Sequence, residues 1–480
     1  MKVAIVHYHL QPGGVTRVIE NTMRAWEQND TGPDQCVVLT GRPYPGNVLQ
    51  QVQVVEGLDY AEAKDAISST SLKQRLEQGA RDALGALPDI WHIHNHSLGK
   101  NPALTGAVAE LASAGASILL QPHDFAEDGR ANNFTNLSSS KERAYPTAPQ
   151  IHYAALNQRD QSFLQKSLEG SLSTVHLLAN AIPENQPNLP CSSGGKFPDL
   201  PENLFLYPVR AVRRKNLGEL ALLSTAYPEF HFANSLGPTN PSFLPGYQSW
   251  IDFASRQGLQ LTYGIGEQTE ASFPELVGLA HSLVNVSVAE GFGLGFLEPW
   301  TFGKSLCGRN LPEITADFTE LGLNLDHLYN EIYVDSSLID KQELEQATAI
   351  ALKKVYSQYG RNLPDNGIIQ AYNSICTAEG VKFGYLNEDL QKSVIEKAKG
   401  SELTIAEIRK QTSLHLLNDD QIEKNKYAVK ENFSLQMYGK KVFGIYQQIT
   451  QANPEAVQFT GCEPMLDRFL CPERLNLLRV

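Results

Sequence analysis

Two glutamates, Glu290 and Glu298, bracket a glycine-rich run, and their spacing is the clearest chemical signal in the sequence. Residues 287–300 have the pattern of a strand end, a loop and a helix start, with Pro299 in the first helical turn. Backbone amides in such a loop favour a bound anion. A carboxylate accepts hydrogen bonds from neighbouring hydroxyls, which is how proteins bind ribose or hexose. The simpler alternative is that Glu298 only favours the helix N-terminus through the helix dipole.

A basic cluster, residues 210–216, follows the first strand expected in the second half of the chain. Charge runs are usually solvated surface, but this one stands at a strand end, where parallel sheets bind their ligands. Arginine provides a bidentate fork for phosphate oxygens. We therefore predict that Arg210 and Lys215 bind a diphosphate.

A glycine pair, Gly13 and Gly14, stands where the first expected strand turns into the first helix. Glycine lets a ligand approach the backbone at a helix N-terminus, although an ordinary tight turn explains the pair equally well. The pair is not part of a G-x-G-x-x-G fingerprint, which disfavours a nicotinamide-dependent oxidoreductase.

Alternating histidines, His92, His94 and His96, would face one way in a strand. A metal site is disfavoured because no clear carboxylate or cysteine ligand pattern accompanies them. We expect instead that the strand ends at a cleft, and that His94, Asn95, His96 and Lys100 help to bind an acceptor.

The elements that must position these residues alternate between short apolar strands and amphipathic helices, which predicts doubly wound parallel sheets. A proline- and glycine-rich linker, residues 183–202, separates two such series. We expect an N-terminal Rossmann-like acceptor domain at 1–182 and a second Rossmann-like domain at 203–432 that contains a helical insertion. A closing helix and tail follow at 433–480. Packing of this segment back on the first domain is one arrangement that we consider. The strands are expected at 3–6, 36–40, 90–93, 117–121, 151–155, 175–179, 204–209, 230–234, 260–263, 283–288 and 305–307.

Composition narrows the class of protein. The chain has 480 residues and a net charge of −13, which argues against a general nucleic-acid binder. Its six cysteines show no C-x-x-C spacing, so reduced thiols are expected. No apolar run is long enough to span a bilayer and no signal-peptide core is seen, so a cytoplasmic location is expected.

The ordered set of motifs resembles that of retaining glycosyltransferases with the GT-B fold, especially the large family 4. Residues 290–298 resemble the E-x7-E motif of that family, and Arg210 with Lys215 its R-x4-K clamp. Further matches, in the family's order, are Gly13-Gly14, the histidine–aspartate pair His123-Asp124, residues 179–182 and residues 311–314. Asn216 departs from the pattern, since the family often has glycine there. The long segment 382–430 departs as well.

The resemblance implies two domains that face a central cleft, and it implies a role for each matched residue. Glu290 would contact the transferred sugar and Glu298 the ribose, while Arg210 and Lys215 would neutralise the leaving diphosphate. His123 would contact the donor sugar near the reacting centre, and Asp124 would lie beside it on the acceptor side. The remaining donor-binding residues would be Gly13, Gly14, Gly291, Phe292, Gly293 and Leu294.

The function predicted from these features is transfer of a hexose, with retention, from an NDP-sugar of the UDP-glucose or GDP-mannose type to a hydroxyl. A soluble acceptor is favoured because the N-terminal half has no marked basic amphipathic helix. No cofactor or divalent metal is required, since two cations and helix amides suffice for the leaving group. The alternatives are a sugar-nucleotide epimerase of the same fold and a non-catalytic nucleotide-sugar-binding protein. Homo-oligomerisation is left open.

Overall fold

The computed structural model describes residues 1–29, 31–183, 200–201 and 203–480. The chain divides into two compact units, each of which is described by itself. Unit 1 comprises Met1–Pro183, Tyr356–Arg361 and Glu431–Cys471, and unit 2 comprises Glu184–Val355, Asn362–Lys430 and Pro472–Val480. Most of the predicted linker, 183–202, lies outside the described residues.

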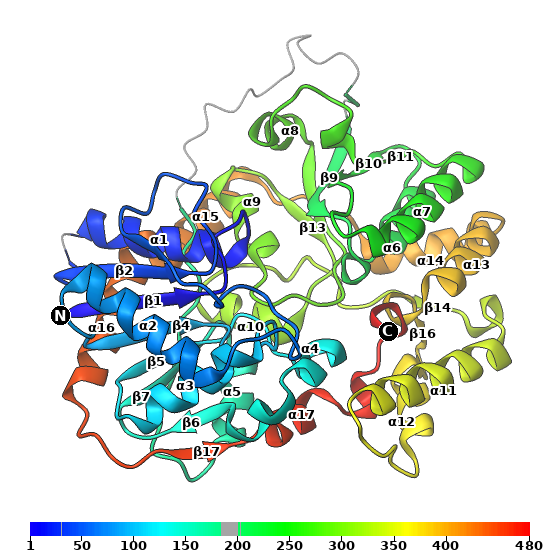
Figure 1. Ribbon diagram of the computed structural model, residues 1–480. Coiled ribbons are helices and arrows are strands. Elements are labelled where there is room, and N and C mark those ends of the chain that lie inside the picture. Colours follow the sequence, from blue (N-terminus) through cyan, green and yellow to red (C-terminus); the bar gives the residue numbers. More distant parts are fainter. Residues whose placement is uncertain (30, 184–199, 202) are drawn as a thin grey trace. The chain divides into compact units, whose positions relative to one another are not determined.

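Unit 1 contains a parallel sheet in the order β3-β2-β1-β4-β5-β7-β8 (Figure 1). Its strands are β1 (Lys2–His7), β2 (Gln35–Thr40), β3 (Val52–Val54), β4 (Ile90–His94), β5 (Ile118–Gln121), β7 (Ile151–Ala155) and β8 (Val175–Leu177). The central strands are buried along almost their whole length because helices cover both faces of a parallel sheet. In β1, Val3 to Val6 are fully buried.

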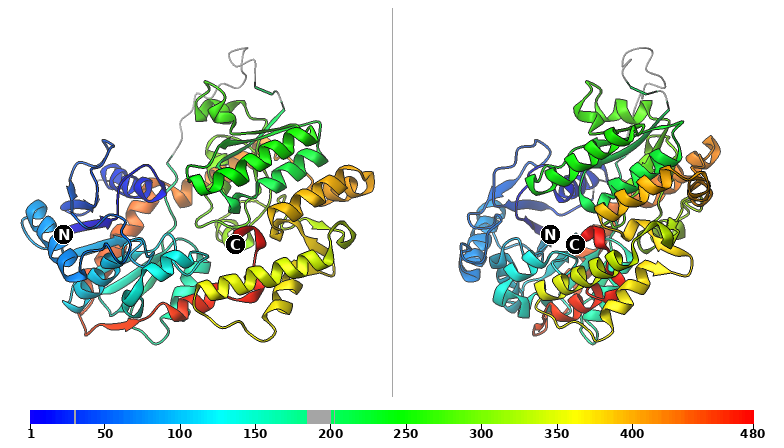
Figure 2. Two further views of the ribbon diagram at one scale, coloured as in Figure 1. Left: turned by 45° about the vertical axis from the view of Figure 1, so that its right-hand side comes forward. Right: turned by 90° about the vertical axis from the view of Figure 1, so that its right-hand side faces the viewer.

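The helices of unit 1 include one from the C-terminal part of the chain. They are α1 (Gly14–Asn29), α2 (Ser69–Leu84), α3 (Pro102–Ser113), α4 (Ala131–Asn136), α5 (Gln158–Ser167), α16 (Leu435–Gln451) and α17 (Glu463–Phe469). In Figures 1 and 2, α16 lies beside α1 although the two are far apart in sequence. The tail then adds β17 (Gln458–Thr460), which pairs antiparallel with β6 (Tyr145–Thr147).

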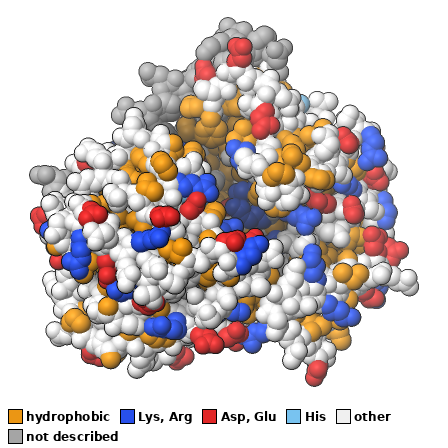
Figure 3. All heavy atoms as spheres, in the orientation of Figure 1, with side chains coloured by type: hydrophobic (Ala, Val, Ile, Leu, Met, Phe, Trp, Pro, Cys, Tyr) orange, Lys and Arg blue, Asp and Glu red, His pale blue; other side chains and the backbone are white. Residues whose placement is uncertain are grey.

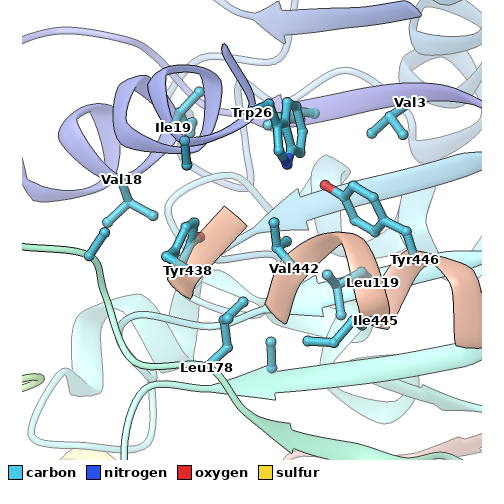
Figure 4. Close-up of a cluster of buried hydrophobic side chains, with 14 of the residues drawn as sticks. Val3, Val18, Ile19, Trp26, Leu119, Leu178, Tyr438, Val442, Ile445 and Tyr446 are labelled. Carbon is cyan, nitrogen blue, oxygen red and sulfur yellow. The ribbon is translucent and has the colours of Figure 1, made fainter. Parts of the chain in front are cut away.

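Helix α16 is held by apolar burial. Tyr438, Val442 and Tyr446 on one face of α16 pack against Ile19 and Trp26 of α1 (Figure 4). The i, i+4, i+8 spacing of the three α16 residues places them on a single stripe. Burial of large apolar side chains contributes about 1.5–3 kcal/mol each, so the stripe fixes the helix on unit 1.

Unit 2 contains a smaller parallel sheet in the order β11-β10-β9-β12-β13. Its strands are β9 (Leu204–Arg210), β10 (His231–Leu236), β11 (Leu261–Tyr263), β12 (Ser282–Asn285) and β13 (Leu306–Gly308). A second, antiparallel sheet has the order β14-β16-β15 and consists of β14 (Tyr333–Val334), β15 (Cys376–Thr377) and β16 (Gly380–Lys382). The larger sheet has the central crossover of a Rossmann-like fold, with β9 between β10 and β12.

The helices that begin in unit 2 include those of the charged segment 382–430. They are α6 (Leu217–Ala226), α7 (Leu244–Gln257), α8 (Phe273–Leu279), α9 (Glu298–Thr301), α10 (Pro312–Glu320), α11 (Lys341–Gln358), α12 (Gly367–Ile375), α13 (Glu388–Lys399), α14 (Glu402–Thr412) and α15 (Asp419–Phe433). None of the helices in the described ranges is long and apolar enough to cross a membrane.

The predicted α/β class with two Rossmann-like domains is confirmed, and each expected strand is present with ends shifted by a few residues. The predicted helix at 433–449 corresponds to α16. Strand β3 was missed because it is short and lies at the sheet edge, where its side chains are largely exposed. The central cleft stays a prediction.

Candidate active site

In unit 2, a sharp turn between β9 and α6 positions the basic cluster. Arg210 ends β9, and Arg213–Lys215 form a single 3₁₀ turn before α6 begins at Leu217. Asn216, between them, has φ 54° and ψ 54°, the left-handed conformation. Glycine adopts this conformation most easily and asparagine is the common substitute. The turn therefore explains why asparagine can stand where related motifs have glycine.

An ion pair joins this turn to the loop after β12. Lys215 Nζ forms an ion pair with Glu290 Oε1, and Ser287 Oγ donates to the same oxygen at 2.6 Å. The backbone N–H of Val288 donates to the carbonyl of Arg214 at 2.9 Å. Burial by itself raises the pKa of Glu290, but Lys215 and Arg214 outweigh it and lower the pKa below its usual value. The carboxylate is thus held ionised and in one orientation.

The glycine-rich loop ends at Glu298, where a helix begins as predicted. Gly293 has φ 90°, and a Cβ there would lie 2.8 Å from the side chain of Ile314, so both backbone and space require glycine. Phe292 is buried and its ring packs edge-on against Phe318. Glu298 is the first residue of α9. The loop is therefore anchored by packing at one end and by the Lys215–Glu290 ion pair at the other.

A fully buried ion pair, Arg309 with Glu219, lies behind the basic turn. Arg309 Nη2 donates to Glu219 Oε2 at 2.6 Å, and the Tyr329 hydroxyl donates to Glu219 Oε1 at 2.9 Å. Asn216 Nδ2 donates to Glu219 Oε2 at 2.8 Å, and Gln391 Nε2 donates to Asn216 Oδ1 at 2.9 Å. Both charged groups of this network, Glu219 and Arg309, have hydrogen-bond partners, which is the condition under which buried charge is tolerated. The network fixes the conformation of Asn216 and so the position of Lys215.

A carboxylate and an aromatic ring lie at the carboxyl ends of β10 and β11. Arg210 Nη1 donates to the carbonyl of Gly237 at 3.0 Å, and the N–H of Gly237 donates to Glu267 Oε1 at 3.1 Å. Tyr247 lies so close to Gly237 and Gly264 that a Cβ on either glycine would crowd the Tyr247 ring. The group is at the sheet edge where doubly wound folds bind nucleotides.

In unit 1, histidines gather at the carboxyl ends of β1, β4 and β5. Nδ1 of His94 lies 2.8 Å from Nε2 of His123, and the two ring planes differ by 21° with centroids 5.1 Å apart. His7 contacts His94 edge-on, with centroids 6.2 Å apart. His92 bonds on one side to the Tyr446 hydroxyl and on the other to Gln121, at 2.8 and 2.9 Å.

These histidines are uncharged at neutral pH. Burial lowers the pKa of His7 and of His123 to about 3 and that of His92 to about 4. Burial and three neighbouring imidazoles hold the pKa of His94 well below its usual value. A histidine whose folded pKa is lowered becomes charged only when the pH falls below that value, so the cluster stays neutral above about pH 5.

The residues predicted to bind the acceptor divide into two groups. His94, Asn95 and His96 are buried, with at most 2% of the residue exposed, and their side chains bond to the protein. Burial leaves them no direct route to an acceptor in this structure. Lys100 is partly exposed and lies over the Tyr60 ring at 5.3 Å. The described residues provide no carboxylate partner for its ammonium.

The loop after His123 is supported from three directions. Asn95, with φ 54°, accepts at Oδ1 from the backbone N–H of His123 at 2.6 Å. Asp124 forms an ion pair with Arg130. The Tyr359 hydroxyl accepts from the Arg130 N–H at 2.7 Å and donates to the carbonyl of Ala126 at 3.0 Å. No local sequence signal connects Tyr359 to this loop, and this part of the site was missed.

The glycine pair has open space around it. A Cβ on Gly14 would meet nothing within 4 Å, and one on Gly13 would be 3.7 Å from the Gln11 carbonyl. Neither glycine has a positive φ. The packing of unit 1 therefore does not itself require glycine here, which leaves room for a ligand at the N-terminus of α1.

Proteins of known sequence or structure resemble this chain over most of its length. No family model matches the chain. It is 24% identical over 490 residues to a protein of Petrotoga mobilis named mannosylglucosyl-3-phosphoglycerate synthase, covering 95% of this chain and 93% of the relative.

Two solved structures share the fold. The Anabaena protein Alr3699/HepE, solved with UDP and glucose, has a TM-score of 0.53 and 12% identity, and the match covers 93% of this chain and 99% of that one. Sucrose-phosphate synthase from Thermosynechococcus elongatus has a TM-score of 0.52 and 11% identity, with coverage of 93% and 98%. The predicted resemblance to GT-B glycosyltransferases is confirmed, and the chain has their two-domain fold.

Breaking the buried ion pair tests its structural role. Arg309→Leu should lower the stability of unit 2 by about 3–5 kcal/mol, because Glu219 is left as an unpaired buried charge. Arg474→Leu is the matched control, since its bidentate pair with Glu313 is more exposed and should be worth less than about 1 kcal/mol. Thermal unfolding followed by circular dichroism measures both. Equal losses in the two variants would contradict the anchoring role.

Proposed function

We propose that the chain is a retaining glycosyltransferase that moves a hexose from an NDP-sugar to a hydroxyl of an anionic acceptor. The observation that carries the proposal is the basic turn at the carboxyl edge of the unit 2 sheet, where Lys215 is paired with the Glu290 carboxylate. In a GT-B fold this is a place for a diphosphate and the sugar attached to it. Retention rests on the resemblance to retaining enzymes of this fold.

Lys215 can bind a phosphate without releasing Glu290. An ammonium group has three N–H donors, and one of them is used by the ion pair. Arg210 donates from Nη1 to the Gly237 carbonyl, which orients the guanidinium at the strand end. Two fixed cations would stabilise the negative charge that develops on the diphosphate as the glycosidic bond breaks.

Glu290 and Glu298 have different proposed tasks. The position of Glu290 is fixed by Lys215 and Ser287, so its carboxylate would accept hydrogen bonds from hydroxyls of the transferred sugar. Glu298 at the start of α9 would bind the ribose hydroxyls. We do not assign either residue as a covalent nucleophile, because in retaining hydrolases the two carboxyls flank the bond that breaks.

The acceptor side belongs to unit 1. The relative from Petrotoga mobilis is named for a product that contains phosphoglycerate, which carries phosphate and carboxylate charge. We propose an acceptor of this anionic class for the present chain, with Lys100 as its cation and Asp124 beside the reacting hydroxyl. His94, Asn95 and His96 would then support His123 rather than touch the acceptor.

Labelled donor tests the proposed reaction against its alternatives. With NDP-[¹⁴C]hexose and a panel of hydroxyl acceptors, we expect a transfer product and free NDP. The double variant Arg210→Ala, Lys215→Ala should lose about 10³-fold in kcat through lost leaving-group stabilisation, while Arg256→Ala, on the exposed end of α7, should not change the rate. An isomerised donor with intact NDP would instead identify an epimerase. Binding without turnover would identify a sensor.

The nucleotide base is tested at Glu267. Guanine has two adjacent N–H donors that suit one carboxylate, whereas the Watson–Crick edge of uracil has a single N–H donor. We therefore expect GDP to raise the melting temperature more than UDP or ADP, by mass action. Glu267→Gln should remove the advantage of GDP, and Glu270→Gln, exposed in the same loop, should keep it. A wild-type protein stabilised equally by UDP and GDP would show that Glu267 does not select the base.

Lys100 tests the charge of the acceptor. Lys100→Gln should raise KM for a phosphorylated or carboxylated acceptor about 10-fold, because a charge-assisted hydrogen bond is lost. The KM for the donor should stay unchanged. Lys64→Gln is the control, since Lys64 is exposed and paired with Glu62. An unchanged acceptor KM in Lys100→Gln would remove Lys100 from the acceptor site.

A further inference from the structure

The bond between His94 and His123 needs one proton, and which ring holds it decides what His123 offers to a substrate. A neutral imidazole has one N–H donor and one lone-pair acceptor. Nδ1 of His94 and Nε2 of His123 are 2.8 Å apart, so one of these two nitrogens donates and the other accepts. The protonation of the outer nitrogen of each ring follows from that choice.

The surroundings of His94 favour one direction. Its other nitrogen, Nε2, is buried and has no hydrogen-bond partner among the residues that the structure describes. If His123 donated, His94 would have to carry its proton on this Nε2, which would be an orphaned buried N–H. Orphaned buried donors are rarer than unsatisfied acceptors. The lower-cost arrangement has the proton of His94 on Nδ1, directed at His123.

We infer that His94 is a positioning residue that donates from Nδ1 to Nε2 of His123, and so forces His123 to present an Nδ1–H donor to the substrate. This inference rests on the proposed function for its catalytic meaning, but not for its protonation pattern. His123 would act as a fixed hydrogen-bond donor to an oxygen of the sugar or the acceptor. It would not act as a base, because its lone pair is already occupied by His94.

The neighbours of the pair hold this arrangement in place. Asn95 accepts at Oδ1 from the N–H groups of His123 and Asp124, at 2.6 and 3.2 Å, which fixes the backbone under the His123 ring. His92 does not compete for the His94 proton, because its own nitrogens bond to Tyr446 and Gln121. Within the described chain no hydrogen bond reaches Nδ1 of His123, so this atom is left for a ligand.

The protonation pattern can be measured directly on the full-length protein without substrate. With ¹⁵N-histidine labelling, long-range ¹H–¹⁵N spectra separate protonated from unprotonated ring nitrogens. His123→Gln identifies the His123 signals by their loss. We expect His123 protonated at Nδ1 and neutral from about pH 5.5 to 8. A signal showing His123 protonated at Nε2, or an imidazolium near pH 7, would overturn the inference.

Two variants of similar shape then test the role of the bond. Asn can donate from a position close to that of the His94 Nδ1–H, whereas Leu has a similar shape and no donor. His94→Leu should release the tautomer of His123 and lower kcat about 10-fold with the donor KM nearly unchanged, as expected for one lost hydrogen bond. His94→Asn should restore both the Nδ1–H signal and most of kcat. Equal kcat in the Asn and Leu variants would overturn the positioning role.

The two proposals fail in different ways. If no NDP-sugar is turned over, the proposed function fails, while the spectra of the wild type still decide the protonation of His123. If transfer occurs but His123 carries its proton on Nε2, the proposed function stands and the inference about His94 is wrong.

Discussion

The carboxylate of Glu219 is the constraint on which the basic turn of unit 2 depends. It is fully buried, and it accepts hydrogen bonds from Arg309, Tyr329 and Asn216. A charge this deep is stable only while each lone pair has a partner. Arg309 follows β13 and Asn216 opens α6, so one carboxylate fixes the ends of two elements at the same sheet edge. The left-handed turn at Asn216 then directs Lys215 to Glu290. The position of the Lys215–Glu290 ion pair thus depends on the buried ion pair between Arg309 and Glu219.

The two units place groups of opposite character at equivalent sheet edges. Unit 2 presents charge, since the pKa of Glu290 is lowered by Lys215 and Arg214 in spite of burial. Unit 1 presents neutral imidazoles, since burial lowers the pKa of His7 and His123 to about 3. Fixed charge suits the stabilisation of a leaving diphosphate. Neutral hydrogen-bonding groups suit the orientation of hydroxyls without the cost of desolvating an ion. This difference in charge is what we expect of the donor and acceptor roles in the proposed function.

Features that depend on neighbouring residues in the sequence could be predicted, whereas contacts between residues far apart in the sequence could not. The strands of the two parallel sheets other than β3, helix α16 and the segment from Glu290 to Glu298 are local patterns, and the sequence predicted them. The network of Glu219 and Arg309 joins residues 90 positions apart, and neither residue stands in a motif. The burial of His96 also depends on tertiary packing, so a polar residue that looked available for a ligand proved to be enclosed.

The buried histidines show that polar residues at a strand end need not contact a ligand themselves. A run such as residues 92–96 suggests ligand contact, because polar side chains at a strand end are costly to bury without a purpose. Here these polar side chains form hydrogen bonds within the protein. His92 is satisfied by Tyr446 and Gln121, Asn95 holds the backbone of His123, and His94 bonds to its ring. Each of these hydrogen bonds restricts the position of the group that it reaches. The run therefore positions His123, and its own side chains are enclosed by the protein.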